Sequence, residues 1–157
     1  MNWLMIVLRL IHVGGGAMWV GMMAFMTFYL TPALAEVGPQ ESGKVMAALQ
    51  KQRIMIVMPI IALLTIGSGL WLMMHLYGGA SGFASSRMGM ALNVGAASAI
   101  LAFIIGIVVM RPLMMKSMTT TDPAEAQRLR ARGATLSRAV ARLLMLALGA
   151  MAVARYL

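Results

Sequence analysis

The chain contains two histidines, His12 and His75, and each lies within a long apolar run. An ionisable side chain inside a membrane-spanning helix is costly in free energy, so it marks a candidate functional site. Neutral imidazole is the commonest metal ligand in proteins and a frequent axial ligand of haem iron. Two imidazoles ligate the same iron only if the helices that carry them bring them to the same depth in the membrane.

The composition predicts an integral membrane protein. Of the 157 residues, 61% are hydrophobic and 11% are charged, whereas soluble domains average about 25% charged residues. Several apolar runs exceed the roughly 20 residues that a membrane-spanning helix needs. We therefore expect an all-α, polytopic four-transmembrane-helix bundle with up-down-up-down topology, forming a single integral membrane domain over residues 1–157. The expected spans are about 3–30, 54–77, 87–110 and 139–154.

The basic residues predict the orientation. Connections 31–53 and 111–138 carry nine lysines and arginines, whereas the side with the termini carries Arg9, Arg87 and Arg155. The positive-inside rule places the richer side in the cytoplasm. We expect a multi-pass protein of a bacterial inner (plasma) membrane with both termini periplasmic or exterior. The net charge of +9 then faces lipid headgroups, and nucleic acid is not an expected partner.

This topology puts both histidines on the outer side, His12 in the outer half of span one and His75 near the outer end of span two. At about 1.5 Å per residue their depths agree to roughly 5 Å. Glycines would leave space for a planar macrocycle, tryptophans could wall its edges, and arginines could pair with its propionates. We predict a haem b ligated by both histidines. The residues expected to bind the cofactor are Arg9, Gly15, Gly16, Trp19, Trp71, Arg87 and Asn93.

Simpler structural interpretations remain open. His12 would also serve as a hydrogen-bond donor between helices, and His75 would sit at the membrane interface near a helix end. For the glycines taken alone, close helix packing is the favoured interpretation. The 19 methionines include pairs that suit Cu(I), but methionine is spread over all spans and is also a flexible apolar filler.

The first span resembles the first core helix of the copper-resistance D type membrane proteins. The resemblance comprises the LRLIHV start, Trp19 seven residues after His12, Gly21, Phe25 and the exit at residues 31–34. The His-to-Trp spacing is also similar to that of the bacterial haem-b protoporphyrinogen oxidase. A looser similarity in span two comprises Arg53, Pro59, Thr65, Gly67 and Gly69.

The resemblance implies a polytopic helical bundle with His12 as a site residue. The oxidase is thought to use a lysine in its third helix together with that histidine, and span three has no lysine. Protoporphyrinogen oxidation is therefore disfavoured. Copper is the alternative metal that the resemblance implies, with no copper ligand carried over beyond His12.

Three functions remain at this point. The first is haem-b binding for electron transfer or redox chemistry, and any enzymatic activity would be that of an oxidoreductase. Two histidine ligands would leave no site on the iron for a substrate, which favours electron transfer over O₂ chemistry. The second is copper handling, and the third is a cofactor-free accessory role in a larger membrane complex. A redox partner, a larger membrane complex or a homo-oligomer is an expected partner besides the lipid bilayer.

Overall fold

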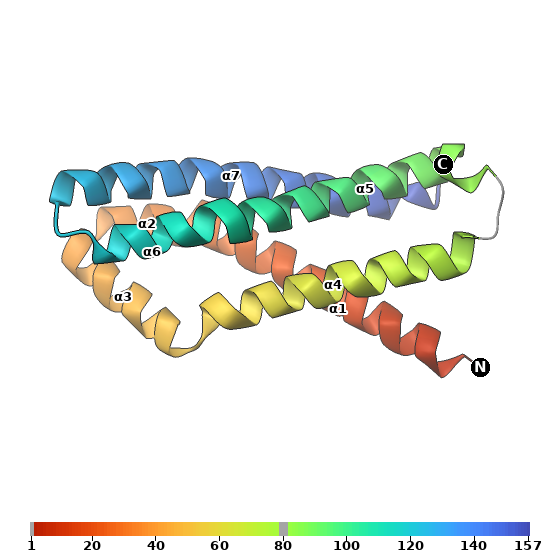
Figure 1. Cartoon of the computed structure of the whole chain (residues 1–157), viewed down its shortest axis with the longest axis horizontal. Helices are drawn as coiled ribbons and strands as arrows, with labels where there is room; N and C mark the ends of the chain where they lie inside the picture. The colour runs from red at the N-terminus through yellow and green to blue at the C-terminus, as the bar shows by residue number, and fades with distance from the viewer. Residues whose placement is uncertain (1, 79–81) are drawn as a thin grey trace.

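A computed structural model describes residues 2–78 and 82–157, and Figure 1 shows the resulting bundle. The elements in chain order are α1 (Trp3–Phe25), the π-helix η1 (Met26–Leu30), α2 (Thr31–Glu36), α3 (Pro39–Lys51), α4 (Ile54–Tyr77), the 3-10 helix η2 (Phe83–Ser85), α5 (Arg87–Ile104), the π-helix η3 (Ile105–Met110), α6 (Arg111–Thr119) and α7 (Pro123–Ala154). The predicted all-α four-helix bundle is confirmed.

Four helical segments of the described chain are long and apolar enough to cross a membrane, namely Trp3–Glu36, Ile54–His75, Arg87–Thr119 and Pro123–Ala154. The chain is therefore a multi-pass membrane protein. Both termini lie at one end of the bundle, and the α2–α3 and α6–α7 turns lie at the other end (Figure 1).

Spans one and three are longer than the sequence predicts. The expected ends at residues 30 and 110 precede Pro32 and Pro112, because proline lacks an N–H and its ring clashes with the carbonyl four residues earlier. The structure instead widens each helix into a π-helix just before the proline. The N–H of Thr31 donates to Met26 O, and the N–H of Arg111 donates to a carbonyl five residues back in the same way. This wider turn lets both helices continue past the proline.

The helix that contains the fourth span begins at Pro123, before residue 139, where the span itself is predicted to start. Asp122 caps α7 by accepting a hydrogen bond of 2.9 Å from the N–H of Ala124, and Pro123 occupies the first turn. A capped start with proline in this position is a strong helix initiator. The helix then runs without interruption to Ala154.

The bundle consists of two closely packed helix pairs, α1 with α4 and α5 with α7. A small core joins the pairs, with a side chain from every span: Trp19, Ala62, Ala102, Val140 and Leu144. Trp19 contacts Phe103 of α5 edge to face, with 6.5 Å between ring centroids. These contacts hold the α1–α4 pair, which carries both histidines, against the α5–α7 pair.

Each pair contains a glycine where its two helices touch, 17 residues before the proline that follows the π-helix. A Cβ added to Gly15 would lie 2.5 Å from Thr65 Oγ1 of α4, and one added to Gly95 would lie 3.0 Å from Met151 Cγ of α7. Small residues let membrane helices approach closely. The close-packing interpretation of the glycines is therefore confirmed for Gly15.

Candidate functional site

His12 lies half-buried on α1 and points into the contact with α4. Its Nδ1 is 2.8 Å from the backbone oxygen of Thr65. A carbonyl oxygen only accepts hydrogen bonds, so Nδ1 must carry the proton and donate it. In the neutral imidazole the free lone pair then belongs to Nε2. The contact with α4 thus fixes both the tautomer and the orientation of the ring.

Gly69 of α4 makes room for this imidazole. A Cβ added to Gly69 would collide with His12 Cε1 and would lie 2.6 Å from Nδ1 and 3.3 Å from Nε2. Thr65 and Gly69 are four residues apart, so they lie one above the other on the same face of α4. Neither was predicted as a site residue, although both belong to the loose similarity noted in span two.

The acceptor carbonyl is part of a small polar network within α4. Ser68 Oγ donates to Thr65 O at 3.1 Å as well as to Leu64 O at 2.6 Å, and Thr65 Oγ1 donates to Ile61 O at 2.8 Å. Thr65 and Ser68 are both buried. Polar groups at membrane depth must find partners within the protein, and this network supplies them. It also anchors the carbonyl that orients His12.

His75 lies elsewhere on α4. Its ring is exposed and stacks on Trp71, with 4.7 Å between ring centroids and 9° between ring planes. The six residues from Gly69 to His75 span about 9 Å along the helix axis. The structure therefore brings His75 to Trp71 and does not bring it to His12.

The tilt of α1 explains this separation. Two helices that run side by side would bring the histidines to one depth, whereas α1 crosses α4 and diverges from the bundle toward its N-terminus (Figure 1). The helices are in contact where Gly15 meets Thr65. His12, one turn before Gly15, therefore meets α4 at Gly69, well short of the outer end that carries His75.

The other predicted site residues occupy three kinds of position. Gly16 belongs to the α1–α4 contact, because a Cβ there would lie 3.5 Å from Thr65 Cγ2. Trp19 is a core residue, 6% exposed, because it lies on the part of α1 that faces α5 and α7. The exposed residues are Arg9, Trp71, Arg87 and Asn93, and the Asn93 amide donates to Ala84 O at 3.5 Å.

The surroundings of His12 are open toward the lipid side of α1. Leu10 and Val13, beside it on the helix, are 68% and 67% exposed. His12 Nε2 has no hydrogen-bond partner within the part of the chain that the structure describes. Nε2 is therefore the ring nitrogen of His12 that is able to bind a metal.

No protein-family model matches the chain, and comparisons with curated proteins and with solved structures give no match. The class of protein follows from the fold, which is that of an all-α, multi-pass membrane protein.

Proposed function

We propose that this chain is an integral membrane haem-b protein for electron transfer or redox chemistry, with His12 Nε2 as an axial ligand of the iron. The observation that carries the proposal is the hydrogen bond from His12 Nδ1 to Thr65 O. Histidines that ligate metals almost always donate their other ring N–H to a carbonyl, a carboxylate or water, which fixes the tautomer and makes the ligating nitrogen more basic.

Haem is a candidate group for this site because the macrocycle brings four nitrogen ligands of its own. It needs only one or two side chains from the protein, and it is flat and apolar apart from its propionates. When bound, it would supply an iron that gains and loses one electron. His12 would hold that iron, and the Thr65 carbonyl would keep the imidazole oriented. The guanidinium of Arg9, one turn before His12 on α1, is suited to pair with a propionate.

The proposal departs from the sequence-based hypothesis in one respect. With His75 stacked on Trp71, this chain offers one imidazole to the iron in place of two. A haem held by His12 alone would be able to bind a small molecule or a ligand from a partner. The resemblance of the first span to membrane proteins with a site histidine at this position supports the choice of His12.

The purified protein is expected to contain haem b. The chain would be produced with a haem supply and purified in detergent. Its reduced-minus-oxidised absorption spectrum, a haem-to-protein ratio and elemental analysis for iron and copper would then be recorded. A Soret band with stoichiometric iron supports the proposal. A colourless protein that also fails to take up added haem contradicts it, and stoichiometric copper in that protein would favour copper handling.

A further inference from the structure

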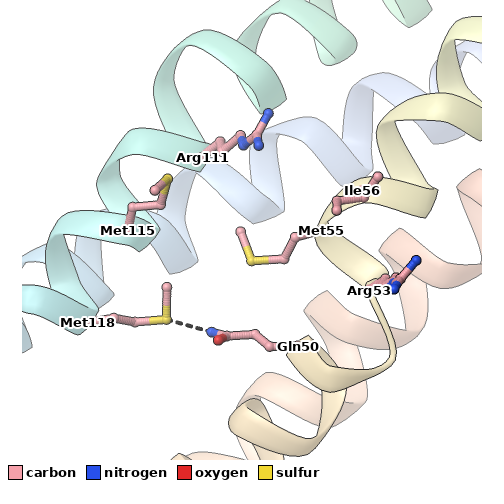
Figure 2. Close-up of a pocket in the computed structure, with 7 residues that line it drawn as sticks. All are labelled: Gln50, Arg53, Met55, Ile56, Arg111, Met115 and Met118. Carbon is pink, nitrogen blue, oxygen red and sulfur yellow. Dashed lines mark hydrogen bonds between the residues drawn. The ribbon is translucent and has the colours of Figure 1, made fainter.

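A second candidate site lies at the opposite end of the bundle from the termini. It is an open cavity of about 280 Å³ between the start of α4 and the helix α6, shown in Figure 2. The lining residues come from α3, the α3–α4 turn, α4 and α6: Gln50, Arg53, Met55, Ile56, Arg111, Met115 and Met118. The cavity is thus separate from the site at His12.

The cavity carries two positive charges. Arg53 at the α3–α4 turn and Arg111 of α6 line it from different sides, and we call them the rim arginines (Figure 2). The ion pairs given by the described residues join Lys44 to Glu41 and Lys116 to Glu125, so neither rim arginine takes part in one there. None of the lining residues is acidic. The rim is therefore complementary to an anion.

The backbone at Arg53 is unusual. Among the described non-glycine residues, it alone has a positive φ, 57°. Its N–H donates to Gln50 O at 2.9 Å, and its carbonyl accepts from the N–H groups of Ile56 and Val57. This left-handed conformation is unfavourable for a non-glycine residue, and glycine is the usual choice at such a helix end. This turn places Arg53 on one side of the cavity.

The remaining walls are apolar and flexible. Met55 and Met118 project into the space between α4 and α6, and Gln50 Nε2 donates to Met118 Sδ at 2.7 Å (Figure 2). Ile56 and Met115 are 55% and 52% exposed. Methionine adapts to irregular apolar ligands. The cationic rim and the apolar wall together match a molecule that has a negative headgroup and hydrocarbon chains.

We propose that this cavity binds one anionic phospholipid, with its phosphate between Arg53 and Arg111 and the start of its acyl chains against the methionines. Basic pockets between membrane helices on the cytoplasmic side are suited to anionic headgroups, and this end carries most of the lysines and arginines. The volume accommodates a headgroup, and the acyl chains would continue along the outer surface of the bundle. A copper ion is a poorer match because two cationic side chains border the methionine sulfurs.

The test is lipid binding by the full chain in detergent micelles, measured by native mass spectrometry with dioleoyl phosphatidylglycerol and dioleoyl phosphatidylcholine. The double variant Arg53→Gly/Arg111→Gln removes both rim charges, and glycine also accepts the positive φ at residue 53. Because each arginine near a membrane surface contributes about 1 kcal/mol, we expect about fivefold weaker phosphatidylglycerol binding per arginine and about 25-fold for the pair.

The matched control is Arg128→Gln/Arg130→Gln, which removes two exposed charges of α7 that do not line this cavity. It should retain nearly the wild-type affinity. An equal loss in the control, or equal binding of phosphatidylcholine by the wild type, would overturn the proposal. Displacement of the lipid by stoichiometric sodium phosphate would assign the site to free phosphate. Copper bound by the wild type and lost in Met115→Leu would assign it to a metal.

Discussion

The variant His12→Ala is expected to lose its haem completely, whereas His75→Ala retains it. In the proposed arrangement His12 Nε2 is the ligand that the chain contributes, whereas the His75 ring stacks on Trp71. Removal of His12 also deletes its hydrogen bond to α4, but interhelical hydrogen bonds of this kind average only about 0.6 kcal/mol. The bundle should therefore stay folded. Absorption spectra and haem-to-protein ratios of the two purified variants measure the difference.

Size-exclusion profiles of the two variants serve as the folding control for this comparison. Restoration of the Soret band in His12→Ala by added imidazole would show that the haem pocket persists without the ligand. Equal haem loss in both variants would favour two-histidine ligation, which requires the helices to move relative to each other. Full haem retention in His12→Ala would exclude His12 as the ligand.

The second large effect is expected from Gly69→Ala. The added Cβ would lie 2.6 Å from His12 Nδ1 and would collide with Cε1, so the imidazole must leave its position over α4 and lose its bond to Thr65 O. Loss of a hydrogen-bond partner that orients a metal ligand typically weakens metal affinity by 10–100-fold. We expect haem affinity to fall by that factor, as measured by titration of haem into the apoprotein.

Gly67→Ala is the matched control, because a Cβ at Gly67 has no neighbouring atom within 4 Å. Both variants make the same chemical change in the same helix and differ only in contact with α1. Gly69→Ala should also destabilise the helix pair by about 1–3 kcal/mol through overpacking, visible as a lower thermal midpoint. Identical haem titrations for the two variants would show that the orientation of His12 by α4 is unimportant for the cofactor.

The four-helix fold is predictable from the sequence because membrane helices must be long, apolar and continuous. The capped start of α7 is likewise a local feature, readable from Asp122 and Pro123. The continuation of spans one and three past Pro32 and Pro112 is not predictable in this way. It depends on the π-helical turns at Met26–Leu30 and Ile105–Met110, which have no local signal in the sequence.

The site was only partly predictable. His12 is recognisable in the sequence because it is an ionisable residue within an apolar run. Its partners are the backbone carbonyl of Thr65 and Gly69, which has no side chain to fill the space of the ring. Neither has a chemical signature in the sequence. Their selection depends on the way α1 crosses α4, with Gly15 at the contact. The same geometry places Trp19 in the core and leaves His75 beside Trp71. Two helices running side by side would instead have brought His75 to the depth of His12.

The central claim is that a single imidazole of this chain, that of His12, holds the haem iron. Electron paramagnetic resonance of the oxidised, haem-loaded protein tests it most directly, because it distinguishes one axial imidazole from two. The account predicts a high-spin ferric signal that becomes low-spin when imidazole is added and fills the open position. A low-spin, two-imidazole signal that added imidazole leaves unchanged would contradict it.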